Sequence, residues 1–247
     1  MPKFFVPENQ IEKEIITILG EDVNHIKNVL RLQREDEIII CSLSTSLNYL
    51  CKIQEIQDTK IICDIEKQVM KQSESNIHVD IFQGIPKFDK MESIIQKCTE
   101  IGVKEFTPVC MKRCVVKIEP KEEKKKLERW QKIAEVAAKQ SGRDQIPIVH
   151  PVVKIKNIFD LLVKYDIVLV AYEQEKANTL KKQLQLLKIV ENPKIAVVIG
   201  PEGGLEEQEI QQLRQHHAKI VTLGNRILRT ETAPIVMAAN ILYELEE

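Results

Sequence analysis

Short apolar runs separated by polar breaks fill the first seventy residues. Four runs rich in isoleucine span Ile15–Leu19, Glu37–Cys41, Tyr49–Ile56 and Lys60–Ile65, with Ser, Asn and Asp between them. Runs of this length bounded by turn-forming residues are typical of strands. Residues 1–70 are therefore predicted to form a small β-barrel or sheet.

One segment between the first two runs has a different period. In Asp22–Leu32 the apolar residues recur about every 3.6 positions, which predicts a short amphipathic helix. The polar side of this segment and the residues just after it are basic, through His25, Lys27, Arg31 and Arg34.

Beyond a polar linker at about 70–76, strands and helices are predicted to alternate. The strand candidates are His78–Gln83, Glu105–Val109, Ile167–Ala171, Ile195–Ile199 and Lys219–Leu223. Because the third and fourth are almost wholly apolar, they suit parallel strands covered on both faces. Residues 77–247 are thus predicted to form an α/β domain.

Amphipathic stripes place helices between these strands. They cover Phe88–Ile101, Glu122–Gln140, a segment marked by Leu180, Leu184 and Leu187, and Leu205–His217. The first ends at Gly102, a residue favoured just after a helix C-terminus.

Composition narrows the class of protein. Of the 247 residues, 43% are hydrophobic and 30% charged, as in ordinary folded chains, and no run approaches the roughly 18 apolar residues of a membrane span. Without a signal-peptide core or a paired Cys motif, a cytoplasmic protein with reduced cysteines and no metal is expected. The net charge of −1 hides a middle third, 71–150, with 16 Lys and Arg against 12 Asp and Glu, where a phosphate-binding patch is most favoured.

Three of the eight glycines lie together in Gly200-Pro201-Glu202-Gly203-Gly204, directly after the most apolar strand. Glycines at the carboxyl end of a parallel strand let the backbone approach a ligand closely. There is neither a G-x-G-x-x-G pattern nor a Walker A loop, so a Rossmann dinucleotide site and a P-loop are both excluded. A tight turn without a ligand is the alternative for this segment.

A second loop repeats the arrangement of strand, glycine and helix start. It runs from Leu223 to Pro234 with the sequence LGNRILRTETAP. Either Thr230 or Thr232 suits the N-cap of the next helix. A plain surface pair of Arg229 with Glu231 is the alternative to a functional role here.

Together the two loops resemble the RsmE family of bacterial 16S rRNA (uracil-N3) methyltransferases. Further stretches resemble the same family in order along essentially the whole chain: Pro2–Val6, His25 with Val29–Arg31, Lys87–Glu92, Gln96–Val103, Arg113–Val116, Glu128–Trp130 and Gln140–Arg143. The chain departs from the family pattern at Glu35, where a glycine is frequent, and at Pro234, where a small residue is more usual.

The resemblance implies a fold and a cofactor. The fold would be a PUA-like RNA-binding β-barrel at 1–70 and a SPOUT α/β domain at 77–247 with a trefoil knot, working as a homodimer in the cytoplasm. The cofactor would be S-adenosylmethionine, and the substrate 16S rRNA, within the 30S subunit. The implied cofactor-binding residues are Ile199, Gly200, Gly203, Leu223, Gly224, Ile227, Leu228 and Thr230.

Methylation at uracil N3 requires loss of a proton, so negative charge spreads onto the neighbouring carbonyl oxygens. Arg229 is expected to stabilise that charge. Glu231 or Glu202 is expected to orient Arg229 or to take the proton. The candidates for phosphate and sugar contacts are Lys3, His25, Arg31, Arg34, Arg113, Ser141 and Arg143.

Two other functions remain open at this stage. The chain could be a SPOUT methyltransferase acting on another RNA, such as transfer RNA, or on ribose. It could also be a non-enzymatic RNA-binding factor for ribosome assembly that keeps the fold without the cofactor.

Overall fold

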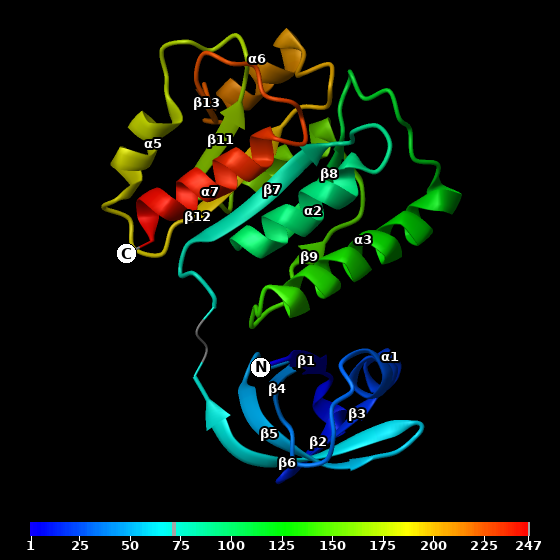
Figure 1. Cartoon of the computed structure of the whole chain (residues 1–247). Coiled ribbons are helices and arrows are strands. Elements are labelled where there is room, and N and C mark those ends of the chain that lie inside the picture. The colour runs from blue at the N-terminus through cyan, green and yellow to red at the C-terminus, as the bar shows by residue number, and fades with distance from the viewer. Residues whose placement is uncertain (71–72, 247) are drawn as a thin grey trace. The chain divides into compact units, whose positions relative to one another are not determined.

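A computed structural model describes residues 1–70 and 73–246 (Figure 1). The chain divides into two compact units. Unit 1 comprises residues 1–74 and 138–146, and unit 2 comprises 75–137 and 147–247. The predicted boundary near residues 70–77 lies close to the first crossing between the units, whereas the return of 138–146 to unit 1 has no counterpart in the sequence prediction.

Unit 1 contains a six-stranded sheet in the order β1-β4-β5-β6-β3-β2. Its strands are β1 (Lys3–Val6), β2 (Ile11–Glu12), β3 (Ile15–Leu19), β4 (Glu37–Ser42), β5 (Asn48–Ile56) and β6 (Lys60–Val69), with a 3-10 turn, η1, at Glu8–Gln10. All four predicted strands are confirmed. Their alternate residues, such as Ile16, Ile38 and Ile53, form a buried apolar core.

The predicted helix at 22–32 is shorter and partly wound differently. A single α turn, α1 (Glu21–Asn24), passes into a π-helical segment, η2 (His25–Val29). The wider turn is seen in the hydrogen bond from the Leu30 N–H to the His25 carbonyl, at 2.9 Å. The chain leaves the helix at Arg31, which has a positive φ of 53°.

The segment 138–146 is held in unit 1 by polar and apolar contacts. The Asp144 carboxylate accepts hydrogen bonds from the Lys3 ammonium at 2.6 Å, from the Asn48 amide and from the Ser73 hydroxyl at 2.9 Å. Ala138 packs in a small buried cluster with Phe5 and Cys41. These contacts join the first strand to a segment more than 130 positions further along the chain.

Unit 2 is built on a parallel sheet in the order β10-β8-β7-β12-β11-β13, with β9 paired to β8. The strands are β7 (His78–Gly84), β8 (Glu105–Cys110), β9 (Ile148–Val149), β10 (Val153–Lys154), β11 (Ile167–Ala171), β12 (Lys194–Ile199) and β13 (Lys219–Val221). The expected parallel α/β architecture is confirmed. The two most apolar runs lie side by side in the sheet as β11 and β12, and both are almost wholly buried.

Helices cover both faces of this sheet, as Figure 1 shows. They are α2 (Lys90–Ile101), α3 (Pro120–Gln140), α4 (Phe159–Leu162), α5 (Leu180–Leu187), α6 (Glu207–Gln215) and α7 (Ala233–Leu245), with a 3-10 turn, η3, at Ile155–Asn157. Residues of α4 and α6 share one buried cluster with Phe82 and Val198 of the sheet. On the other face α7 packs against α2 and α5. Every strand that carries site residues is therefore held from both sides.

The helix limits differ from the predicted ones in two informative places. Helix α2 begins at Lys90, because Phe88 has a φ of +56° and cannot belong to a helix. Helix α7 begins at Ala233, with Pro234 in its first turn, where a proline loses no intrahelical hydrogen bond. Neither Thr232, at the N-cap position, nor Thr230 caps it, since Thr230 turns toward Gly200.

Candidate functional site

A cavity of about 570 Å³ lies at the carboxyl edge of the unit 2 sheet. Its walls come from the loops that follow β11, β12 and β13 and from Lys90 at the start of α2, so the connections after four neighbouring parallel strands all deliver residues to one place. Ligands of open α/β sheets bind at this edge. The volume lies within the roughly 300–1,000 Å³ of small-molecule sites.

All eleven residues predicted for catalysis or cofactor binding line this cavity. They are Ile199, Gly200, Glu202, Gly203, Leu223, Gly224, Ile227, Leu228, Arg229, Thr230 and Glu231. The two loops that carry them are 18 or more positions apart in sequence, and the structure brings them together.

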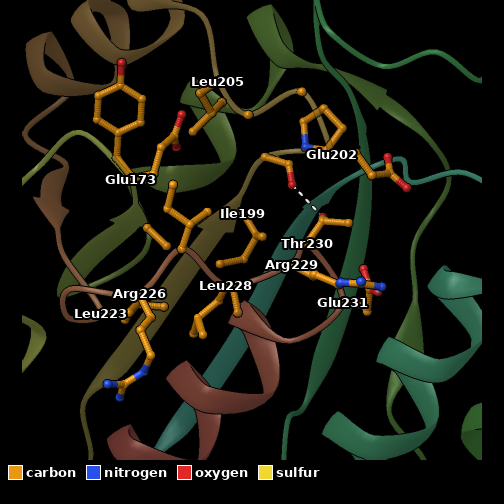
Figure 2. A pocket seen from close by; sticks show the side chains of 18 of the residues that line it. Glu173, Ile199, Glu202, Leu205, Leu223, Arg226, Leu228, Arg229, Thr230 and Glu231 are labelled. Atoms are coloured by element: carbon orange, nitrogen blue, oxygen red, sulfur yellow. Dashed lines mark hydrogen bonds and ion pairs between the residues drawn. The ribbon is translucent and has the colours of Figure 1, made fainter.

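A buried hydrogen-bond chain joins the two loops. The Thr230 hydroxyl donates to the Gly200 carbonyl at 2.7 Å, which Figure 2 shows as a dashed line, and accepts from the Gln83 amide at 3.0 Å. Gln83 lies on β7 with no exposed surface. The loop after β13 is thus anchored to β12 and β7 by one threonine.

Two glycines are needed for different physical reasons. At Gly200 a Cβ would lie 2.9 Å from the Gly204 carbonyl carbon, so the turn closes only without a side chain. At Gly224 a Cβ would meet nothing within 4 Å, but its φ of +113° favours glycine strongly. The first glycine is required by close packing and the second by backbone conformation.

The cavity has an apolar middle and charged ends. Figure 2 shows Ile199 and Leu228 between Glu173 on one side and the group of Glu202, Arg229 and Glu231 on the other, with Leu223 beside Arg226. A flat apolar group of a ligand fits against the aliphatic side chains, while its polar atoms can reach main-chain groups of the glycine loops.

The charged group is held together by a lysine from the start of α2. Lys90 Nζ lies 3.0 Å from Glu202 Oε1 and 3.3 Å from Glu231 Oε2. Glu202 Oε1 also accepts the Lys87 N–H at 3.0 Å. Arg229 is 83% exposed and lies 4.0 Å from Glu231, so its guanidinium is only loosely tied.

These contacts alter the acid-base properties of the group. Burial acts to raise the pKa of Glu202, but the Lys87 N–H and the Lys90 ammonium outweigh it, and the pKa lies below its ordinary value. In return, the hydrogen bond to Glu202 raises the pKa of Lys90. A carboxylate with a lowered pKa is a weak base, so the orienting role suits Glu202 better than proton transfer.

Two charged cavity residues outside the glycine loops, Lys90 and Glu173, were missed by the sequence analysis. Lys90 lies six positions after the end of β7, and Glu173 two positions after the end of β11. The rule that places ligands at the carboxyl ends of parallel strands could have identified both. Its use for these two residues requires the order of the strands in the sheet, which is not readable from the sequence.

Three of the RNA-binding candidates lie around η2 in unit 1. His25 packs edge-on against Phe4, with ring centroids 6.1 Å apart, so its ring is half-buried. Arg31 is exposed, and Arg34 is exposed with a 3.5 Å contact to Glu35. The two arginines therefore have the accessibility that phosphate contacts require.

Two other candidates have their charges neutralised inside unit 1. Arg143 is 3% exposed and forms a 2.7 Å ion pair with Glu74, and Lys3 is paired with Asp144. Because both cations are buried and paired with carboxylates, they are not accessible to RNA phosphates. We therefore remove Lys3 and Arg143 from the proposed RNA-binding set. Ser141, half-buried beside them, also lies in unit 1.

Arg113 is the RNA-binding candidate in unit 2, and it lies beside the cavity. Its guanidinium donates to the Gly203 carbonyl at 2.9 Å and lies 3.9 Å from Glu206. The side chain is 45% exposed, so it supports the glycine loop and still faces solvent.

At the amino ends of β7 and β8 a second polar cluster, His78, Asp80 and Glu105, brings its ligand atoms within 4.8 Å of one another. Each member already has a partner in unit 2. His78 Nε2 lies 2.8 Å from Asp80 Oδ1, the Tyr165 hydroxyl donates to Asp80, and His150 bonds Glu105 at 2.7 Å.

No helix in the described ranges is long and apolar enough to cross a bilayer.

Comparison with known proteins identifies the class of this fold and site. The family model described as an RNA methyltransferase domain matches residues 73–242, and the one described as an RNA methyltransferase PUA domain matches residues 18–66. These matches define an RNA methyltransferase with a PUA-like N-terminal domain and a parallel-sheet C-terminal domain.

Individual relatives narrow the assignment. The chain is 37% identical to ribosomal RNA small subunit methyltransferase E of Bacillus subtilis, across 100% of this chain and 98% of the relative. The solved structure of ribosomal RNA small subunit methyltransferase E from Neisseria gonorrhoeae, bound to S-adenosyl methionine, is 30% identical with a TM-score of 0.86, covering 98% of this chain and 97% of that one. A putative methyltransferase from Legionella pneumophila, solved with bound SAM, is 26% identical with a TM-score of 0.85, covering 98% and 96%. The chain belongs to the ribosomal RNA small subunit methyltransferase E family, which confirms the resemblance drawn from its sequence.

Proposed function

We propose that this protein transfers a methyl group from S-adenosylmethionine to N3 of a uridine in 16S rRNA of the small ribosomal subunit. The observation that carries the proposal is the meeting of the two glycine loops in one cavity, joined by the Thr230–Gly200 hydrogen bond. Membership of the methyltransferase E family and the SAM-bound relatives support the cofactor and the substrate class.

The residues present fit S-adenosylmethionine. Close approach of the Gly200 and Gly204 backbones leaves main-chain groups at the cavity wall, where they can bind the polar edges of an adenosine. Ile199, Leu223 and Leu228 would enclose its base. Glu173, at the opposite end from the Arg229 group, is suited to a hydroxyl or an ammonium group of the same ligand.

When bound, S-adenosylmethionine supplies a methyl carbon activated by the sulfonium, whose bond to sulfur breaks as the bond to N3 forms. Sulfur keeps the electron pair, and the N3 proton must leave. Arg229, exposed and only loosely paired, can turn its guanidinium toward the uracil carbonyl oxygens and stabilise the developing negative charge.

Glu231 is the better placed of the two carboxylates to receive the N3 proton. Its Oε2 atom is buried beside Lys90 Nζ at 3.3 Å, whereas its Oε1 atom lies 4.0 Å from Arg229 and is the oxygen proposed to take the proton. Glu202 already accepts two donors, so we assign it the orientation of Lys90.

The knot, the homodimer and the location of the protein also belong to this proposal. After β13, at one edge of the sheet, the chain crosses to Thr230, which bonds Gln83 of β7, before α7 packs against α2. Such a return past two strands supports the trefoil knot of SPOUT domains. A homodimer would have twice the 28.5 kDa mass of one chain when measured by sedimentation. A ribosomal substrate would place the protein in the cytoplasm.

Calorimetry with S-adenosylmethionine tests the cofactor site. Binding with a dissociation constant in the micromolar range is expected for the parent. Gly200→Ala should abolish it, because its Cβ would lie 2.9 Å from backbone. The control is Gly20→Ala in unit 1, where nothing lies within 4 Å but the φ is +78°; it introduces backbone strain away from the cavity and should leave the affinity unchanged. A parent that binds no S-adenosylmethionine would favour a non-enzymatic assembly factor.

Methylation of 30S particles from a strain lacking its own methyltransferase E tests the reaction. Nucleoside mass spectrometry should detect N3-methyluridine, and Arg229→Ala should lower the rate while cofactor affinity stays unchanged. A ribose-methylated product, or activity on transfer RNA alone, would replace the proposal with another RNA methyltransferase.

A further inference from the structure

One aromatic side chain next to the cavity has no role in the fold. Of the six phenylalanines in the sequence, Phe88 is the only one in the exposed class, at 86%. It lies in the loop between β7 and α2, and no ring contact holds it in the described structure. An apolar ring in water contributes nothing to stability, so its position needs another explanation.

The backbone under this ring is strained. Phe88 has a φ of +56°, in the left-handed region that glycine occupies readily and that a bulky residue avoids. Strain of this kind persists where surrounding structure fixes the backbone, and it gathers at functional sites. The sequence therefore keeps a phenyl ring where a glycine would be easier to accommodate.

The loop is fixed from both sides against the proposed methyl-transfer site. Before it, Gly84 lies so close to Pro201 that a Cβ would come within 2.7 Å of it. Lys87, immediately preceding Phe88, donates its N–H to Glu202 at 3.0 Å, and Lys90, two positions later, contacts Glu202 and Glu231. Phe88 is therefore within one or two residues of the charged end of the cavity, on a rigid base.

The chemistry of this end favours a nucleobase as the partner of the ring. The apolar middle of the cavity, which suits the adenosine, lies to one side of the charged group in Figure 2, and Phe88 directly follows Lys87, whose N–H contacts that group. Lys87 and the exposed Arg229, which lies at the same charged end of the cavity, are both cations that suit an RNA backbone. Aromatic side chains beside basic groups bind unpaired bases by stacking.

We propose that Phe88 stacks on an unpaired base of the substrate RNA at the mouth of the cavity and so positions the target uridine. This inference rests on the proposed function. It makes Phe88 a positioning residue for RNA, with no part in binding the methyl donor.

Steady-state kinetics with 30S particles and labelled S-adenosylmethionine test the inference. Phe88→Ala should lower kcat/KM for the particles about ten-fold, the effect typical of losing one stacked base, with KM for S-adenosylmethionine unchanged. Phe88→Tyr and Phe88→Trp should stay within about two-fold of the parent, because each keeps a stacking face. Phe88→Leu should behave like Phe88→Ala.

A folding control accompanies these variants. Phe88→Gly relieves the positive φ, so its melting temperature should equal or exceed that of the parent while its kcat/KM for the particles falls with that of Phe88→Ala. A loss of activity together with undiminished stability is not expected for a residue that merely supports the fold.

Several outcomes would overturn the inference. Activity of Phe88→Ala equal to that of an active parent would remove the stacking role and leave the proposed function standing. Full activity of Phe88→Leu would indicate a plain apolar contact. Dissociation of a dimer by Phe88→Ala, seen by sedimentation velocity, would assign the ring to a second copy of the chain. A parent that methylates no RNA would overturn the proposed function, and this inference with it.

Discussion

At the scale of single residues, the clearest signal is backbone conformation. Seven non-glycine residues among the described ones have a positive φ, and they include Glu35 and Phe88. Glu35 is the position where the sequence resemblance leads us to expect a glycine, and its φ of +75° is one that glycine adopts readily. The chain keeps the turn and accepts the strain.

Replacing Glu35 by glycine should stabilise unit 1 by about 0.5–1 kcal/mol, because the left-handed backbone no longer carries a side chain. The two ion pairs that are lost, to Arg34 at 3.5 Å and Lys52 at 3.8 Å, are exposed and contribute little. Urea unfolding of the two proteins measures the difference. Glu37→Gly, in strand β4, is the matched control and should destabilise. A less stable Glu35→Gly protein would show that those ion pairs outweigh the strain.

Thr230→Val should destabilise the protein by about 1–3 kcal/mol, since it leaves the buried Gly200 carbonyl and Gln83 amide without their shared partner. It should also weaken S-adenosylmethionine binding, because the two cavity loops lose their link. Denaturant unfolding and calorimetry provide the two measurements. Thr232→Val removes a hydroxyl that caps no helix and is the control. Equal affinities in both variants would contradict the role given to Thr230.

At the scale of elements, the long apolar runs and glycine motifs were readable from the sequence because their signals are local. Strands β11 and β12 lie within one residue of their predicted limits. The two-residue strands β9 and β10 were not predicted, since edge strands this short have no periodicity to detect. Lys90 and Glu173 were missed because their place in the site depends on strand order.

Helix α6 shows how an element fixes the loop before it. Its buried residue Glu209 accepts the Glu206 N–H at 2.8 Å through one carboxylate oxygen and the Lys112 N–H at 2.9 Å through the other. The first of these bonds closes the N-terminus of the helix directly after Leu205. The end of the glycine loop is thereby anchored to the loop after β8.

Glu209→Ala should therefore cost about 1–3 kcal/mol of stability, because two backbone donors lose their acceptor. Thermal unfolding followed by circular dichroism measures the loss. Gln211→Ala, at an exposed position on the same helix, should change stability by less than about 0.5 kcal/mol. Similar melting temperatures for the two variants would show that water replaces the carboxylate without cost.

At the scale of the whole molecule, each unit is built from two separate segments of the chain. The sequence indicates a polar linker near residue 74 but gives no sign that 138–146 returns, because that segment continues the predicted helix Glu122–Gln140. What binds it to unit 1 is a set of long-range polar contacts centred on Asp144. Such contacts between distant positions are not visible in local patterns.

These contacts make the stability of unit 1 depend on pH. Burial acts to raise the pKa of Asp144, but hydrogen bonds from Lys3, Asn48 and Ser73 outweigh it and hold the pKa well below its ordinary value. A lowered folded pKa contributes stability that is present above the unfolded value of about 3.9 and is lost as the pH falls through the folded pKa.

Asp144→Asn should consequently be less stable than the parent at pH 7, and the difference should shrink below about pH 4. Urea unfolding at a series of pH values between 7 and 3 measures it. Glu66→Gln, exposed on β6, should show no such convergence. A stability difference that stays constant down to pH 3 would contradict the role of the carboxylate charge.

The return of residues 138–146 also has a consequence for biosynthesis. The six strands of unit 1 are complete by Val69, yet the partners of Lys3 and Asn48 emerge from the ribosome about seventy residues later. At bacterial translation speeds the delay is on the order of ten seconds. During that interval the nascent sheet lacks the contacts of residues 138–146. We therefore expect chaperones that bind nascent chains to bind unit 1 at this stage.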